Sequence, residues 1–230
     1  MAKRDGPICH SGYRPRYQTT AHLFLDMEKE DGFPVTDAEY ITLDNVIARA
    51  KKMVRITNNT FPEAITALRT IDDTLKESGF TNQNGTLVSE GLRRKIVNCH
   101  VRSNIYKAIA ETVGLPIALS NAPGHVFVRW LLEDGRYFNW ETTSNPAKLR
   151  KNKEYRSKFN IAPEAIENGN YLSTFTSEQV LAMQYNNQGV FWKRKHQFHK
   201  AVVNYVKALK LDHSKAEFDV LPRPKGRGFL

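Results

Sequence analysis

Residues 120–143, SNAPGHVFVRWLLEDGRYFNWETT, are typical of two antiparallel strands joined by a tight turn, and the length of that turn decides which residues of the two strands share a face. The Asp-Gly pair at 134–135 marks the turn, because glycine adopts the left-handed backbone that short hairpin loops require. A two-residue turn would pair Glu133 with Arg136. A three-residue loop would pair Leu132 with Arg136 instead, and the facing of one strand against the other would change.

The apolar residues favour the longer loop. The three-residue register gathers an apolar set on one face, namely Val126, Val128, Trp130, Leu132, Phe138 and Trp140. It leaves a polar set on the other face, namely His125, Arg129, Asn139 and Glu141. The two-residue register would mix Asn139 and Glu141 into the apolar face. We therefore predict the three-residue loop, in which His125 and Glu141 are diagonal neighbours on the same face of the hairpin.

The segment before the hairpin, NCHVRSNIYKAIAETVGLP at 98–116, predicts a helix. Asn98 can cap its start, and Gly114 and Pro116 are typical of its end. Cys99 then lies in the first turn, where backbone N–H groups and the helix dipole favour the thiolate form of a cysteine. We expect no disulfide with Cys9, the only other cysteine, because the chain has the character of a protein from a reducing compartment.

Cys99, His125 and Glu141 occur in an order that suits nucleophilic catalysis. A thiolate attacks a carbonyl, an imidazole carries the proton, and a carboxylate behind the imidazole fixes its orientation. The backbone N–H of Cys99 is a natural donor to an oxyanion. Taken singly, each residue has a plainer interpretation: a small buried hydrophobe, a hydrogen bonder at a sheet edge and a surface charge.

Three motifs, NCHVRSNIYKAIAETVGLPI, APGHVFVR and YFNWETT, resemble the Cys, His and acid motifs of the transglutaminase-like superfamily, and in particular the SirB-type transglutaminase-like proteins. The resemblance covers roughly residues 40–145. It implies a papain-like α+β core, with Cys99 as nucleophile, His125 as base and Glu141 as third member, where the superfamily usually has Asp. It implies acyl transfer to an amine, or hydrolysis, at a protein or peptide amide. Some SirB-type members lack the cysteine, so a non-catalytic interaction or regulatory scaffold is the alternative.

The remaining chain indicates the domain organisation. Residues 1–36, rich in Gly and Pro, predict an irregular arm, and the catalytic-type domain is expected over 37–147. Helical spacing begins near Asp37. A second helix is predicted with Thr60 as its cap, Pro62 in its first turn and Gly79 at its end. The order of helices, cysteine helix, strands and further helices predicts an α+β fold. Residues 148–176 are interpreted as a basic linker, and residues 218–230 as a disordered basic tail.

Residues 185–217 resemble one tetratricopeptide unit, within helices expected over 177–217. Gly189 stands where two such helices cross, and Tyr205 and Ala208 continue the packing stripe of the second helix. A single unit cannot bury its own face, so it must pack on the catalytic-type domain or on a partner. Capping of that domain and recruitment of a partner are both left open.

The net charge of +10 is concentrated in the second part of the chain. Residues 1–147 hold 18 Lys and Arg against 17 Asp and Glu, whereas residues 148–230 hold 16 against 7. This asymmetry favours an acidic protein partner at the C-terminal region; nucleic acid is the weaker alternative, because no RNA motif or zinc finger accompanies it. No apolar run reaches the length of a signal peptide or a membrane span, so we expect a cytoplasmic protein without a membrane partner. No cofactor is expected, and no metal, because Cys99 and His100 point apart on a helix.

Overall fold

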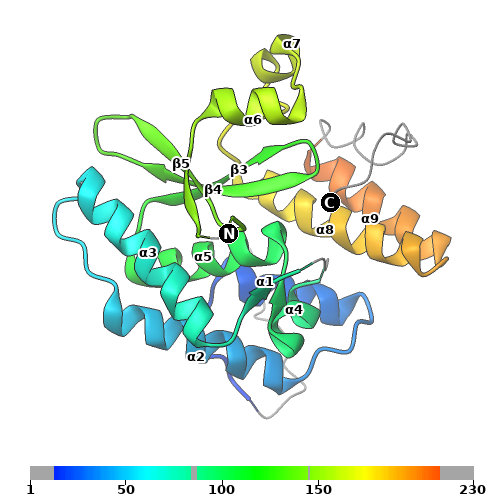
Figure 1. The fold of residues 1–230 in the computed structure, drawn as a ribbon. Helices are drawn as coiled ribbons and strands as arrows, with labels where there is room; N and C mark the ends of the chain where they lie inside the picture. Colours follow the sequence, from blue (N-terminus) through cyan, green and yellow to red (C-terminus); the bar gives the residue numbers. More distant parts are fainter. Residues whose placement is uncertain (1–12, 84–86, 145, 213–230) are drawn as a thin grey trace, which may run out of the picture. The chain divides into compact units, whose positions relative to one another are not determined.

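The computed structural model describes residues 13–83, 87–144 and 146–212 (Figure 1). Its contacts divide the chain into two units, Met1–Thr174 and Phe175–Leu230. The described residues combine helices with small sheets, so the chain is α+β, as the order of predicted elements indicated. The first unit contains the helices α1 (Thr20–Glu30), α2 (Asp37–Met53), α3 (Phe61–Glu77), α4 (Val88–Arg94), α5 (Cys99–Val113), α6 (Asn152–Phe159) and α7 (Pro163–Glu167).

The main sheet of the first unit has four antiparallel strands in the order β3-β4-β5-β6. They are β3 (Ile117–Ala122), β4 (His125–Leu131), β5 (Tyr137–Glu141) and β6 (Lys148–Arg150). A parallel pair, β1 (Thr81–Asn82) and β2 (Ile96–Val97), lies before α5. Helix α5 packs on β3 and β4, and Figure 1 shows α6 on the opposite side of the sheet. The sheet is therefore covered on both faces.

The β4–β5 hairpin has the predicted three-residue loop. The Leu132 N–H donates to the Arg136 carbonyl at 2.8 Å, and the Gly135 N–H donates to the Leu132 carbonyl at 3.1 Å. Gly135 has a φ of 79°, in the left-handed region that favours glycine. The register continues through Val128 opposite Trp140. The prediction from the apolar pattern is confirmed.

Both faces of the hairpin contain buried side chains, for different reasons. On the face toward α5, Val128, Trp130 and Trp140 are at most 2% exposed, as expected for an apolar face that packs on a helix. On the other face, Arg129 and Asn139 are each 2% exposed. Their burial has a cause that the strand pattern did not reveal, since they lie beneath the segment that follows β6.

That segment corrects the interpretation of residues 148–176 as a linker. It contains β6, α6 and α7, and it belongs to the first unit up to Thr174. An apolar cluster lies beneath it, composed of Ala122, Phe127, Tyr155, Ile161 and Leu172. The helix was hard to recognise in the sequence because most of its residues are polar or charged and face water. Its two aromatic residues, Tyr155 and Phe159, four residues apart on one helical face, turn inward.

The N-terminal arm is also corrected in part. Residues 20–30 form α1 rather than irregular chain. Ala21, Phe24 and Leu25 are fully buried, at the spacing of one helical face, so tertiary packing stabilises a helix that the flanking Gly and Pro residues made hard to recognise. Residues 1–12, with Cys9, lie outside the described residues.

The predicted starts of the next helices are confirmed. α2 begins at Asp37, with Thr36 and Glu39 forming a capping box. α3 begins at Phe61 after Thr60, with Pro62 in its first turn. Among the described residues, no helix is long and apolar enough to cross a membrane.

The second unit contains α8 (Ser177–Arg194) and α9 (Phe198–Leu211), which pack against each other as the predicted helix pair. Gly189 stands at their contact: a Cβ atom there would lie 2.6 Å from the Tyr205 ring. The absence of a side chain at Gly189 therefore allows the two helices to approach. The tail at 218–230 lies outside the described residues.

Candidate active site

Cys99 is the first residue of α5. The Oδ1 atom of Asn98 accepts the Val101 N–H at 2.9 Å and caps the helix, as predicted. Cys99 as a whole residue is half-buried. The backbone N–H groups of this first turn have no acceptors within the helix itself, and they surround the thiol with positive potential.

His125 and Glu141 meet on the sheet face opposite to the apolar core face. His125 begins β4 and Glu141 ends β5, and the Nε2 atom of His125 lies 2.7 Å from Oε2 of Glu141. Their side chains are 13% and 4% exposed, respectively. The diagonal contact that the three-residue loop predicted is therefore present, and it is largely shielded from water.

Cys99 is joined to this pair. Its side chain is hydrogen-bonded to His125, and its sulfur also accepts a hydrogen bond from the backbone N–H of Val126. Because Nε2 of His125 is engaged by Glu141, the hydrogen bond to Cys99 uses the other ring nitrogen, Nδ1. The structure thus brings all three predicted site residues together, in the order cysteine, histidine, carboxylate.

The Glu141 carboxylate accepts hydrogen bonds at both oxygens. Thr143 donates to Oε1 from its backbone N–H at 3.1 Å and from its hydroxyl at 2.8 Å. Tyr155 donates its hydroxyl to Oε2 at 3.1 Å, beside the contact with His125. These donors hold the plane of the carboxylate fixed, and they compensate for the loss of water around a buried charge.

The site shifts the pKa of each member of the triad. Burial raises the pKa of Glu141, but the hydrogen bond and charge of His125 together with the Thr143 donors outweigh it and lower the pKa to about 2. Burial lowers the pKa of His125, but its bonds to Cys99 and Glu141 raise it to about 9. Burial raises the pKa of Cys99, yet the hydrogen bond and charge of His125 bring it below its ordinary value. All three net shifts favour a thiolate, an imidazolium and a carboxylate at neutral pH.

Two aromatic rings from α6 cover the histidine. We call Tyr155 and Phe159 the aromatic roof. The Phe159 ring stacks on His125 with centroids 5.6 Å apart, and the Tyr155 ring lies 6.0 Å from it. Tyr155 also stacks on Phe127 at 4.0 Å and is fully buried. The aromatic roof keeps water from the bond between His125 and Glu141, and this strengthens the electrostatic interaction there.

Arg129 anchors the start of α6 to the sheet. Its guanidinium donates to Asn139 at 3.0 Å, to the Leu172 carbonyl at 2.9 Å and to Asn152, the first residue of α6, at 3.4 Å. Asn139 donates to the same Asn152 oxygen at 2.7 Å. The Tyr137 ring covers the guanidinium, with its centroid 4.0 Å from Cζ. These contacts fix the helix that carries the aromatic roof.

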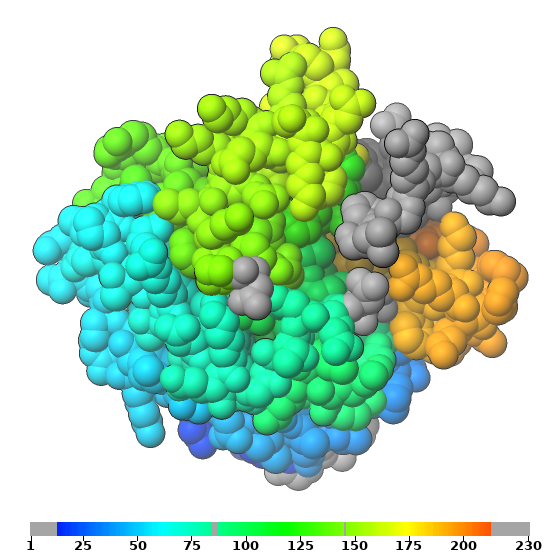
Figure 2. All heavy atoms as spheres, in the orientation of Figure 1, coloured from blue at the N-terminus to red at the C-terminus, as the bar shows by residue number. Residues whose placement is uncertain are grey.

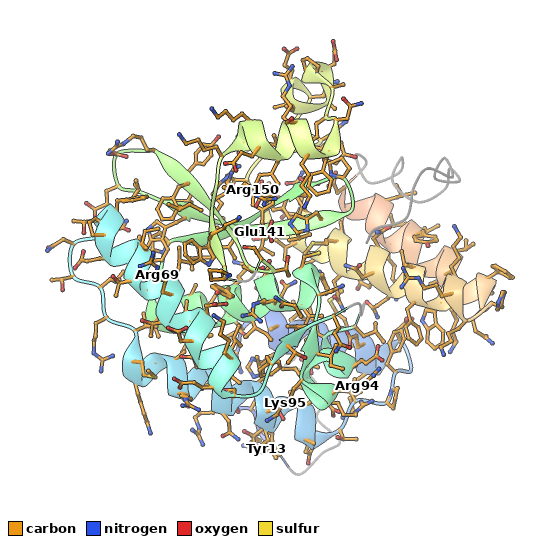
Figure 3. The ribbon with its side chains drawn as sticks, viewed as in Figure 1. Tyr13, Arg69, Arg94, Lys95, Glu141 and Arg150 are labelled. Carbon is orange, nitrogen blue, oxygen red and sulfur yellow. The ribbon has the colours of Figure 1, made fainter. Side chains whose placement is uncertain are left out.

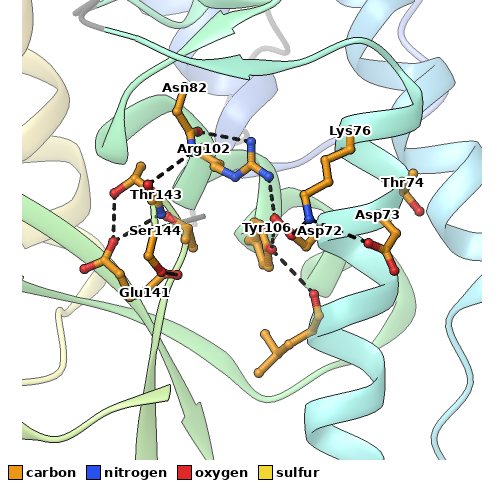
Figure 4. A network of polar contacts seen from close by, with 12 residues as sticks. Asp72, Asp73, Thr74, Lys76, Asn82, Arg102, Tyr106, Glu141, Thr143 and Ser144 are labelled. Carbon is orange, nitrogen blue, oxygen red and sulfur yellow. Dashed lines mark hydrogen bonds and ion pairs between the residues drawn. The ribbon is translucent and has the colours of Figure 1, made fainter. Parts of the chain in front are cut away.

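A second polar network reaches Glu141 from the side of α3 (Figure 4). Asn82 donates to the Thr143 carbonyl at 3.2 Å and accepts from Arg102 at 3.2 Å. Arg102 forms a buried ion pair with Asp72. Thr143, which donates two hydrogen bonds to Oε1 of Glu141, is therefore itself held in place by a chain of contacts that reaches α3.

The sequence did not identify Tyr155, Phe159 or Thr143 as parts of the site. For Thr143 a signal existed, since it follows Glu141 by two residues and can bond back to a carboxylate in that position. For the aromatic roof, the only signal was a pair of aromatic residues four apart in a highly charged stretch. The sequence also identified no second oxyanion donor.

Figure 3 labels Glu141 and Arg150, which come from the neighbouring strands β5 and β6 of the first unit. Comparisons of the chain with protein-family models, with curated proteins and with solved structures found no match. The functional conclusion therefore rests on the geometry and electrostatics of the site.

Proposed function

We propose that this chain is a cysteine-dependent acyl-transfer or amide-hydrolysing enzyme that acts on a protein or peptide amide, with a transglutaminase-like, papain-like core. One observation carries the proposal: His125 is hydrogen-bonded on one side to Cys99 and on the other to Glu141. A histidine in that position can both activate a thiol and donate a proton, because the carboxylate fixes its orientation and stabilises its charged form.

The arrangement of elements supports the proposed core. The cysteine begins a helix that packs on an antiparallel sheet, and the histidine and the acid come from two adjacent strands of that sheet. The sequence resemblance named the same three residues from their motifs. The longer side chain of Glu141, compared with the usual Asp, is accommodated because Thr143 and Tyr155 hold its carboxylate.

In the first step the Cys99 thiolate attacks the amide carbonyl carbon and a C–S bond forms. The carbonyl oxygen takes up the electron pair and becomes an oxyanion next to the backbone N–H of Cys99 at the helix N-terminus. The oxyanion then collapses, the C–N bond breaks, and His125 gives its proton from Nδ1 to the departing nitrogen. The products are a thioester on Cys99 and free ammonia or an amine.

In the second step His125 takes a proton from the incoming nucleophile. Water gives a carboxylic acid and restores the thiol, as in an amidase or peptidase; a primary amine gives a new amide, as in a transglutaminase. Glu141 stays ionised in both steps, because its pKa of about 2 lies far below that of His125. Its role is to stabilise the imidazolium.

An activated ester that can acylate Cys99 provides the test. p-Nitrophenyl acetate is expected to release a burst of about one equivalent of p-nitrophenol and to leave one acetyl group on Cys99, detected by mass spectrometry of the digested protein. Cys99→Ala and His125→Ala should abolish the burst, and a fluorescent primary amine added afterwards measures transfer against hydrolysis. Absence of a burst from the folded wild-type protein would favour the non-catalytic scaffold.

We also propose that α8 and α9 are a tetratricopeptide-like unit. The close approach of the two helices at Gly189 supports this, since small residues are required where such helices cross.

A further inference from the structure

The positive charge of the first unit is confined to one segment. Residues 148–158, which we call the basic segment, contain six cations, Lys148, Arg150, Lys151, Lys153, Arg156 and Lys158, and a single acid, Glu154. Residues 13–147 are balanced, with 16 Lys and Arg against 16 Asp and Glu. This segment includes β6 and most of α6, the helix that carries the aromatic roof.

The cations of the basic segment are not neutralised by the protein. Elsewhere in the first unit ion pairs are frequent, but within the described ranges none of the six forms a salt bridge. Arg150 is half-buried, and its Nε–H is a buried donor without a hydrogen-bond partner there. The other five are exposed. An uncompensated cluster of this kind is available to bind an external anion.

These charges lie next to the candidate active site. The guanidinium of Arg150 is 5.5 Å from the Tyr155 ring, and Nζ of Lys158 is 5.2 Å from the Phe159 ring. Both rings contact His125, so one aromatic side chain separates each cation from the histidine. In the register of the two strands, Lys148 of β6 stands opposite Glu141 of β5. Figure 2 shows the yellow-green part of the chain, which contains α6, at the surface of the molecule.

We propose that the substrate amide belongs to an acidic protein segment, and that the basic segment holds the carboxylates of that substrate beside Cys99. The proposal rests on the proposed function and names its substrate class. These cations should act on a ligand bound at the site more strongly than the more distant charges of the protein do, because salt screens charges beyond a Debye length of about 8 Å.

The orientation of the aromatic residues favours an acidic protein over a nucleic acid. Single-stranded nucleic acids bind where basic grooves carry accessible aromatic rings on which bases stack. The aromatic residues of this segment instead face inward, and Tyr155 is fully buried against Phe127. Lysine and arginine without stacking rings suit carboxylates, which need only charge and hydrogen-bond donors.

The electrostatic potential at Cys99 can be measured by comparing two alkylating reagents of similar size, anionic iodoacetate and neutral iodoacetamide. Both label Cys99 in a Cys9→Ser background, and the ratio of their rate constants reports the local potential. Lys153→Glu/Lys158→Glu should lower the ratio about three- to tenfold at low ionic strength, and salt should reduce the wild-type ratio toward the same value. Lys153→Gln/Lys158→Gln should give a smaller decrease in the same direction with less disturbance of α6.

The matched control is Lys52→Glu/Arg69→Glu, which changes the net charge equally at exposed residues of α2 and α3. It should retain most of the wild-type ratio. Equal ratios in the control and the α6 variants would overturn the proposal. The iodoacetamide rate alone reports whether Cys99 is activated, so failure of the proposed function is read separately from failure of the substrate class.

Competition identifies the ligand class. A Glu-rich decapeptide should slow iodoacetamide labelling of wild-type Cys99, and it should protect Lys153→Glu/Lys158→Glu much less. A Lys-rich decapeptide should have no effect on the wild type. Stronger protection by a single-stranded oligonucleotide of the same charge than by the Glu-rich peptide would overturn the proposal in favour of a nucleic-acid ligand.

Discussion

Tyr155 donates its hydroxyl to Oε2 of Glu141 at 3.1 Å, the same oxygen that His125 contacts at 2.7 Å. The tyrosine comes from α6, outside the β-hairpin that supplies the other two residues. A helix beyond the three sequence motifs therefore completes the acidic end of the candidate triad. The Tyr155 hydroxyl sets the orientation of the Glu141 carboxylate, and the Tyr155 ring covers His125.

Tyr155→Phe tests this hydrogen bond while keeping the ring of the aromatic roof. We expect about a three- to tenfold decrease in the rate of Cys99 acylation, because one hydrogen bond to a charged group is worth about 1.5 kcal/mol or somewhat more and part of that orients Glu141. Tyr40→Phe is the matched control, since Tyr40 is also buried and donates to a carboxylate, that of Asp26, outside the network that reaches Glu141. An equal decrease in both variants would show a general loss of stability.

Glu141→Gln tests the charge of the carboxylate through the pH dependence of folding. The pKa of Glu141 is about 2 in the folded protein against an ordinary value of 4.5, so the folded state binds fewer protons. The stabilisation is complete above pH 4.5 and is lost as the pH falls toward 2. We expect Glu141→Gln to unfold at lower urea concentration than wild type at pH 7, with the difference narrowing below pH 4.5. A difference independent of pH would contradict this assignment.

Asn152→Ala tests the anchoring of α6. It removes the acceptor of Asn139 and Arg129 and leaves buried donors unpaired, at a cost of about 1–3 kcal/mol in the free energy of unfolding. Asn168→Ala, at an exposed residue beyond α7, should change this free energy by no more than about 0.5 kcal/mol. Hydrogen exchange should also become faster in α6, and unchanged exchange there would refute the anchoring role.

The sequence was sufficient for the hairpin register and for the three residues that meet, because each rests on a local pattern. Strand alternation fixed the facing of His125 and Glu141, and the Asn98 cap fixed the position of Cys99 on its helix. The covering segment was missed because its inward residues, Tyr155 and Phe159, are two among many charges, and its helix is stabilised by the sheet beneath it. For the same reason α1 was taken as irregular, since Phe24 and Leu25 acquire their role only by packing.

Gly189→Ala tests the helix contact in the second unit. The added Cβ atom would lie 2.6 Å from the Tyr205 ring, so α8 and α9 must separate or the ring must move. We expect a loss of about 1–3 kcal/mol in the stability of this unit, seen as faster hydrogen exchange in both helices. The double variant Gly189→Ala/Tyr205→Ala should lose less stability than the sum of the losses in the two single variants, because the added Cβ atom then has no ring to clash with. Strict additivity would contradict the contact.

The central claim is that His125 holds Cys99 as a thiolate. The most direct measurement is the pH dependence of iodoacetamide labelling of Cys99 in a Cys9→Ser background, compared with His125→Ala and with His199→Ala, an exposed histidine of α9. Wild type and His199→Ala should titrate at a pH below the ordinary thiol pKa of 9.0. His125→Ala should titrate at a higher pH, because burial then acts without the imidazolium, and it should label at least about tenfold more slowly at pH 7. Equal and slow labelling of all three at pH 7, with the same ordinary thiol titration, would contradict the account.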